Sequence, residues 1–263
     1  MNLAVQTTPA TLVETERKDA WWISPASFFV LFSLFGLWAT FRAFQNDHYE
    51  IGGYLSPFYS PTIKLGLKLG RFEISPALLI LPFPLSFRLT CYYYRKMIYR
   101  SYLANPAACA VKKPGPVWLI RGKNYFGEKA FPFVLMNLHR YAFYAAAIFV
   151  ALLWVDTFKA FFFTTNGVTQ LGIGLGSIVF LVNVLLLSFY TFSCHSFRHL
   201  IGGGTDCYSC SALERTKYGV WRKVSFLNDK HGLWAMMSLV SVALTDVYVY
   251  LIATNTLTDL RIF

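Results

Sequence analysis

The chain has 263 residues, of which 56% are hydrophobic, 18% are aromatic and only 14% are charged. About a quarter of the residues of an average soluble domain are charged, so this composition excludes an ordinary soluble protein. The formal net charge is +11, but the basic residues flank apolar stretches and form no separate domain. That distribution argues against a nucleic-acid-binding protein.

Five apolar stretches are each about as long as the 20 or so residues that a helix needs to cross a bilayer. We therefore predict an all-α, polytopic membrane protein, a single domain over residues 1–263 with five transmembrane helices in a bundle. The predicted spans are 25–44, 74–94, 131–155, 173–197 and 231–253. Pro82 and Pro84 predict a kink in the second span, because proline breaks the helical hydrogen-bond ladder.

Lys and Arg in the connecting segments predict the orientation, since they are enriched in cytoplasmic loops. Six lie on the face that carries the first-to-second and third-to-fourth connections: Arg42, Lys64, Lys68, Arg71, Lys159 and Arg261. Sixteen lie on the face that carries the N-terminus: Arg17, Lys18, Arg95, Lys96, Arg100, Lys112, Lys113, Arg121, Lys123, Lys129, Arg198, Arg215, Lys217, Arg222, Lys223 and Lys230. We expect that second face to be cytoplasmic and to contact anionic lipid headgroups.

Nine of the ten Cys and His residues fall on the expected cytoplasmic side; only His48 does not. Cys91, His139, Cys194 and His231 come from four different predicted helices and lie near the same membrane boundary, so they could meet around one centre. Two thiolates and two imidazoles suit a Rieske-type [2Fe–2S] cluster or zinc, and two facing imidazoles would suit a haem. Considered alone, Cys91 or Cys194 could equally well be a small apolar residue of the core, and His139 could equally well be a structural histidine.

A second possible metal site lies close along the chain. His195 and His199 share a helical face, and Cys207 and Cys210 follow shortly after. The intervening Gly202-Gly203-Gly204 and the spacing match no strong zinc pattern. We expect no disulfide between Cys207 and Cys210, because the cytoplasm keeps thiols reduced.

Charged side chains inside predicted spans need partners, because an unpaired charge is costly in a bilayer. Arg88 and Arg140 could meet a carboxylate, a haem propionate, a quinone carbonyl or another subunit, whereas Arg198 could reach the interface. Asp156 and Asp246 are expected to reach the outer interface, and a proton path is the alternative. Further candidates for a quinone pocket are aromatic and basic residues at the cytoplasmic boundary: Tyr92, Tyr93, Tyr94, Arg95, Trp118 and Trp234.

Several long motifs resemble one known family. They are RLTCYYYR at 88–95, NPAACAV at 105–111, HRY at 139–141, YTFSCHSFRH at 190–199 and LTDVYV at 244–249, together with the Tyr- and Pro-rich loop 54–61. Over nearly the whole length the chain resembles the large membrane-anchor subunit of actinobacterial-type succinate dehydrogenase.

This resemblance implies a subunit of the bacterial plasma membrane, with a cytoplasmic N-terminus, that docks flavoprotein and iron–sulfur subunits. Succinate oxidation would belong to those partners, and electrons would pass through this chain to a quinone, which we expect to be menaquinone. The resemblance further implies an embedded Rieske-type cluster, with Cys91, His139, Cys194 and His231 as ligands and His195, His199 or Cys109 as substitutes. The complex could be a trimer of heterotrimers.

Two alternatives stay open at this point. The chain could be a haem b-type anchor of another oxidoreductase, of the nitrate reductase type. It could also be a transporter that uses Arg88, Asp156 and Asp246 as a charge path, although that function favours ligating residues in both halves of the membrane.

Overall fold

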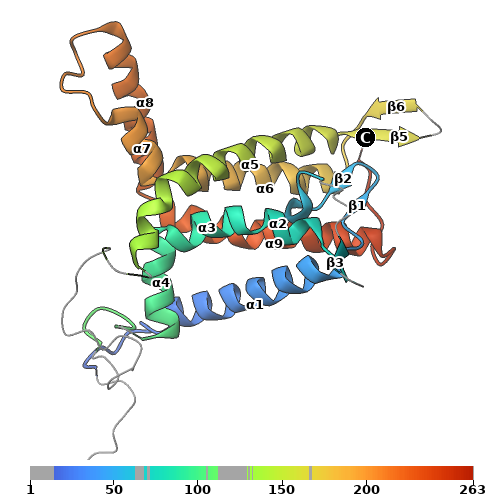
Figure 1. Ribbon diagram of the computed structural model, residues 1–263, viewed down its shortest axis with the longest axis horizontal. Coiled ribbons are helices and arrows are strands. Elements are labelled where there is room, and N and C mark those ends of the chain that lie inside the picture. The colour runs from blue at the N-terminus through green and yellow to red at the C-terminus, as the bar shows by residue number, and fades with distance from the viewer. Residues whose placement is uncertain are drawn as a thin grey trace, which may run out of the picture.

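The computed structural model describes residues 15–62, 68–69, 72–104, 106–111, 129, 131, 133–165 and 168–262. Its main body is a bundle of roughly antiparallel helices that run along the long axis of the molecule (Figure 1). Four helices of the described ranges are long and apolar enough to span a membrane: α1 (Ile23–Gln45), α5 (His139–Lys159) with the short η3 turn (Phe133–Leu138) before it, α6 (Leu175–Phe192) and α9 (His231–Ala253).

The second predicted span is shorter than expected. It consists of α2 (Pro76–Ile80) and α3 (Pro82–Thr90), which together form an apolar segment below the length of a typical span. The Ser75 hydroxyl caps α2 by accepting a hydrogen bond from the backbone N–H of Ala77 at 3.3 Å. The helix restarts at Pro82, which confirms the predicted break at the prolines. An all-α membrane protein is therefore confirmed, but the count of five spanning helices is not.

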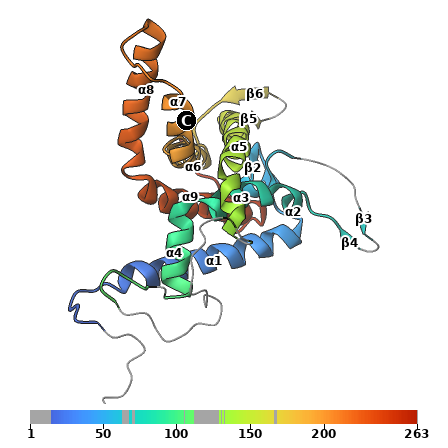
Figure 2. The same ribbon diagram turned by 60° about the vertical axis from the view of Figure 1, so that its left-hand side comes forward.

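Helices at one end of the bundle turn away from its long axis. They are α4 (Tyr92–Tyr102), α7 (His195–Gly202) and α8 (Ala212–Asn228), and Figures 1 and 2 show them projecting at steep angles to the bundle. We call this end, with α4, α7 and α8, the basic end. The second and fourth spans, predicted as continuous to 94 and 197, end instead at Thr90 and Phe192. Hydropathy missed both breaks because aromatic residues, such as Tyr93 and Phe197, continue past them.

The opposite end carries three short antiparallel hairpins and the chain's C-terminus (Figure 1). The hairpins are β1 (Glu50–Ile51) with β2 (Tyr54–Leu55), β3 (Lys68–Leu69) with β4 (Phe72–Glu73), and β5 (Phe162–Thr165) with β6 (Val168–Leu171). The turn η1 (Pro57–Tyr59) follows β2 and packs into the bundle. Burial raises the pKa of Tyr54 in this loop to about 12, so its hydroxyl stays protonated and donates to Asp259 at 2.8 Å.

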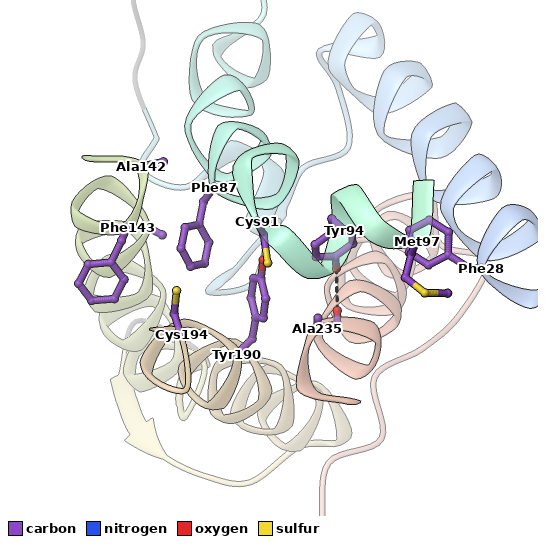
Figure 3. Close-up of a cluster of buried hydrophobic side chains, with 11 residues drawn as sticks. Phe28, Phe87, Cys91, Tyr94, Met97, Ala142, Phe143, Tyr190, Cys194 and Ala235 are labelled. Atoms are coloured by element: carbon purple, nitrogen blue, oxygen red, sulfur yellow. Dashed lines mark hydrogen bonds between the residues drawn. The ribbon is translucent and has the colours of Figure 1, made fainter. Parts of the chain in front are cut away.

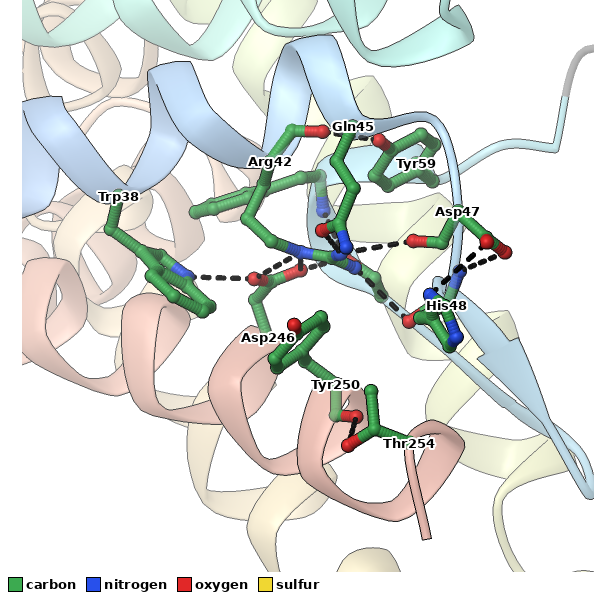
Figure 4. Close-up of polar contacts among 11 residues, drawn as sticks. Trp38, Arg42, Gln45, Asp47, His48, Tyr59, Asp246, Tyr250 and Thr254 are labelled. Carbon is green, nitrogen blue, oxygen red and sulfur yellow. Dashed lines mark hydrogen bonds and ion pairs between the residues drawn. The ribbon is translucent and has the colours of Figure 1, made fainter. Parts of the chain in front are cut away.

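A buried ion pair joins the two helices at this opposite end (Figure 4). Arg42 of α1 and Asp246 of α9 are both fully buried, and Arg42 Nε lies 3.0 Å from Asp246 Oδ2. Trp38 Nε1 donates to the same carboxylate oxygen at 2.7 Å, and the Ser56 hydroxyl donates to the other. The remaining guanidinium N–H groups reach Gln45, Asp47 and His48. The carboxylate is thus satisfied inside the protein.

The side chains of both aspartates in the predicted spans are buried inside the bundle. Asp246 is fully buried and Asp156 is 5% exposed. Asp156 accepts a hydrogen bond from the Ser60 hydroxyl at 2.5 Å and lies 3.3 Å from Lys159 Nζ. Ser56 and Ser60, both in the loop after β2, fold back into the bundle and supply partners that hydropathy cannot reveal, while the position of the aspartates relative to the outer interface stays a prediction.

Candidate functional site

Cys91, His139, Cys194 and His231 lie together at the basic end of the bundle, and we call them the Cys–His site. Each cysteine sits at a helix break: Cys91 joins α3 to α4, and Cys194 joins α6 to α7. Both have extended backbone angles, with ψ of 131° and 144°, and thereby turn the chain away from the bundle axis. The two histidines are the first residues of α5 and α9.

The four side chains form two Cys–His pairs. His139 Nε2 lies 3.1 Å from Cys194 Sγ, and His231 Nε2 lies 3.6 Å from Cys91 Sγ. Each pair joins two elements that are distant in the sequence. The predicted convergence of residues from four helices is therefore present.

A hydroxyl holds the other nitrogen of each imidazole. His139 Nδ1 lies 2.8 Å from Thr90 Oγ1, and His231 Nδ1 lies 2.7 Å from Ser193 Oγ. Thr90 and Ser193 directly precede the two cysteines, so each imidazole bridges one helix break to the other. Hydrogen bonds of this kind fix ring orientation at metal sites. The sequence analysis did not single out Thr90 or Ser193, although both stand next to a Cys at a helix break.

Apolar and aromatic side chains surround the site. Cys91 and Cys194 are 3% and 2% exposed, and Figure 3 shows both side chains pointing into the interior of the bundle beside the rings of Phe87 and Tyr190. The Phe87 ring stacks on His139 with the ring centroids 5.0 Å apart, and the Tyr190 ring stacks on His231 at 5.2 Å. The two sulfurs are therefore shielded from water, whereas the two imidazoles are half-buried.

The geometry is not that of a closed site for one metal ion. Within the described ranges, no group of three or more His, Cys, Asp or Glu side chains is arranged to hold such an ion. Hydrogen bonds between free thiols and imidazoles are enough to explain the two observed Cys–His pairs. A group bound between the four residues would have to separate each sulfur from its imidazole.

The second predicted metal set does not assemble. Cys207 and Cys210 are joined in a disulfide, contrary to our expectation, because the turn before α8 brings their Cα atoms to 5.7 Å, a distance that disulfides span. His199 Nδ1 instead contacts Arg140 NH2 at 2.9 Å, and His195 is exposed. Cys109, the remaining substitute ligand, is exposed and lies 3.7 Å from Arg100 NH2.

Arg88 is buried among neutral groups next to the Cys–His site. Its guanidinium donates to the Tyr94 hydroxyl, to Ala235 O at 3.3 Å and to Ser238 Oγ at 3.3 Å. The guanidinium carbon also lies 4.8 Å from the centre of the Tyr190 ring. None of these partners is a carboxylate.

The other expected quinone ligands do not share one pocket with Arg88. Arg198 lies over the Trp221 ring at 4.8 Å, and Arg95 lies over the exposed Tyr92 ring at 5.3 Å. The Tyr93 ring packs near Gly232, and the Trp234 ring packs against Phe189. Trp118 lies outside the described residues.

A cavity of about 700 Å³ opens between α3, α4, η3 and α5. Most of its lining is apolar, and Thr90, Arg95, Tyr99 and Tyr141 supply polar atoms. It reaches the Cys–His site through Thr90, whose hydroxyl contacts His139. Of the residues that we expected to bind a quinone, Arg95 lines this cavity. Sequence reasoning missed Tyr99 and Tyr141, although both have the amphipathic side chain typical of a membrane boundary.

Comparisons with known proteins agree with this architecture. The chain is 39% identical to a chain of a solved structure described as "Mycobacterium smegmatis Sdh1 complex in the apo form", with a TM-score of 0.80 over 95% of this chain and 94% of that chain. No curated protein matches the sequence. The family described as actinobacterial succinate dehydrogenase subunit SdhC matches residues 23–255. The chain therefore belongs to the family of actinobacterial succinate dehydrogenase membrane subunits.

Proposed function

We propose that this chain carries electrons from a cytoplasmic iron–sulfur subunit to a membrane quinone, as the anchor of a succinate:quinone oxidoreductase. Succinate oxidation belongs to the partner subunits. The observation that carries the proposal is the meeting of two Cys and two His side chains at the basic end of the bundle. A purely structural anchor has no need for four buried or half-buried soft and imidazole donors from four helices, since polar groups in membranes are costly.

The donor set fits a Rieske-type [2Fe–2S] cluster. Such a cluster takes two thiolates on one iron and two imidazoles on the other, and when bound it accepts and releases single electrons. Cys91 and Cys194 would supply the thiolates, and His139 and His231 the imidazoles. The Thr90 and Ser193 hydroxyls would fix the orientation of the two imidazole rings by contacting Nδ1 of His139 and of His231. The same contacts would select the tautomer of each ring.

Two other centres could use some of the same donors. Zinc would take the two thiolates and two imidazoles around one ion, so a paramagnetic signal in the reduced complex separates the cluster from zinc. A haem requires two imidazoles that face each other across a flat ring, whereas here each Nε2 faces a cysteine sulfur. The haem remains the alternative that spectroscopy must exclude.

The cavity at Thr90 is where we place the quinone, which we expect to be menaquinone. Its apolar lining suits a quinone ring, and Arg95, Tyr99 and Tyr141 can donate hydrogen bonds to quinone carbonyls. Thr90 separates the cavity from His139 by one hydrogen bond, which gives a short route for an electron. An opening of this cavity at the membrane boundary would let protons reach the quinone from the cytoplasmic side.

The basic end would receive the flavoprotein and iron–sulfur subunits. Arg100 on α4 and Arg222 and Lys223 on α8 lie in elements that project from the bundle (Figure 2). Charge of one sign on such a surface steers an acidic partner into place. With such docking, we further propose a plasma-membrane location with the N-terminus in the cytoplasm and a complex that forms a trimer of heterotrimers.

Spectroscopy of the purified complex tests the proposal. We expect a Rieske-like paramagnetic signal in the reduced complex that Cys91→Ser and His139→Ala remove, while the signals of the partner's clusters persist. Cys109→Ser is the matched control, because Cys109 is a free but exposed thiol at the same end, and we expect it to change nothing. A sharp reduced α-band of haem, or a complex without either signal, would refute the embedded cluster.

A further inference from the structure

Arg88 is a buried cation without an anionic partner. Its side chain is 5% exposed, and every group it contacts in the described residues is neutral. Arg42, the other buried arginine among the described residues, is different because it faces Asp246 at 3.0 Å. An unbalanced charge inside a membrane protein costs free energy, so such residues are usually functional.

The position of Arg88 relates its charge to the Cys–His site. Its guanidinium carbon lies 4.8 Å from the centre of the Tyr190 ring, and that ring stacks on His231 at 5.2 Å. The charge is therefore at most about 10 Å from the His231 ring. Cys91 also follows Arg88 by one helical turn, and its N–H donates to Arg88 O at 3.1 Å.

Tyr190 supplies a second, independent observation. Its side chain is 2% exposed, yet its hydroxyl has no hydrogen-bond partner among the described residues. Figure 3 shows that hydroxyl directed toward the Cys91 sulfur. A buried hydroxyl without a partner is unfavourable, and a sulfur that carries more negative charge would accept its hydrogen bond.

We propose that Arg88 and Tyr190 raise the reduction potential of the centre held by the Cys–His site. The inference rests on the proposed function and adds the residues that adjust it. Reduction adds one electron and no bond changes, so the negative charge of the site rises by one unit. A fixed positive charge and a hydrogen bond to the ligating sulfur both favour the more negative, reduced state.

Coulomb's law gives the size of the effect. Two unit charges about 10 Å apart at an effective dielectric constant of about 20 shift an equilibrium on the order of tenfold. For a one-electron couple, a tenfold change corresponds to about 59 mV. Loss of the Arg88 charge should therefore lower the midpoint potential by about this amount. Loss of the Tyr190 hydroxyl should lower it by less, by the equivalent of a few-fold change in the same equilibrium.

The test is a redox titration of the purified complex, with the paramagnetic signal of the embedded centre as readout. Arg88→Gln should lower the midpoint potential by the equivalent of about a tenfold change in the redox equilibrium constant. Arg88→Lys keeps the positive charge and should restore most of the lost midpoint potential. Ser238→Asp offers the guanidinium a carboxylate without removing it, and should lower the midpoint in the same direction. Tyr190→Phe removes only the hydroxyl and keeps the ring on His231, so it remains informative even if Arg88→Gln does not assemble.

The control is the double variant Arg42→Gln with Asp246→Asn, which removes a balanced buried pair at the far end and should leave the midpoint unchanged. An intact signal with an unaltered midpoint in Arg88→Gln and Ser238→Asp would overturn the role of Arg88. An unaltered midpoint in Tyr190→Phe would overturn the role of the hydroxyl. A wild-type complex without the signal would instead refute the proposed function.

Discussion

The Arg42–Asp246 pair allows a sharp prediction about what holds α1 to the rest of the bundle. Arg42→Gln leaves the fully buried Asp246 carboxylate without its cation. Breaking a buried pair by removal of one partner costs about 3–5 kcal/mol, because the remaining charge stays desolvated. Asp246→Asn should cost less, roughly 1.5–3 kcal/mol, since Arg42 keeps the acceptors on Gln45, Asp47 and His48.

The double variant should cost less than the two single changes added together, because neither charge is then left alone. A double-mutant cycle should give a coupling free energy of about 1–3 kcal/mol. The measurement is unfolding of the purified chain in mixed micelles by added SDS, followed by far-UV circular dichroism. A cost below about 1 kcal/mol for Arg42→Gln, or a coupling near zero, would refute this reasoning. Unchanged quinone reduction by Asp246→Asn would also exclude this carboxylate from a proton path.

Three further changes test other parts of the structure. Thr90→Val removes the hydroxyl that contacts His139 and should lower the affinity for the proposed centre about 10-fold or more, measured as metal per complex during titration with a chelator. Cys207→Ser removes the disulfide before α8 and should lower the local stability of α7 and α8 by about 2 kcal/mol. We expect faster hydrogen exchange in α7 and α8 while α9 stays protected. Gly176→Ala would place its Cβ 2.5 Å from the Tyr54 ring and should make the chain unfold at a lower SDS concentration. Gly36→Ala is the control: its Cβ would meet nothing within 4 Å, so the change should be neutral or slightly stabilising.

Long apolar stretches made the spanning elements predictable. The predicted span 231–253 coincides with α9, because an apolar run there is bounded by Lys230 and by polar residues after Ala253. The kink before Pro82 followed from proline chemistry alone. Hydropathy failed at Cys91 and Cys194, where extended backbone interrupts the helix although aromatic and apolar residues continue on both sides.

The site was predictable as a gathering of residue types but not as a geometry. Depth along four helices predicted that Cys91, His139, Cys194 and His231 lie at one boundary, and the structure brings them into two pairs. The pairing itself depends on helix rotation, which one Cys or His from each helix does not determine. Partners from distant segments, such as Ser56 for Asp246, escape any local pattern for the same reason.

The two helix breaks have a mechanical consequence. Cys91 is the residue from which α4 departs, and Cys194 is the residue from which α7 departs, so these two projecting helices each begin next to a buried sulfur. A torque applied to either helix from outside is transmitted to that sulfur through a single residue of backbone. We expect that a force on α4 or α7 would change the spacing of the two sulfurs before it bends the long helices behind them.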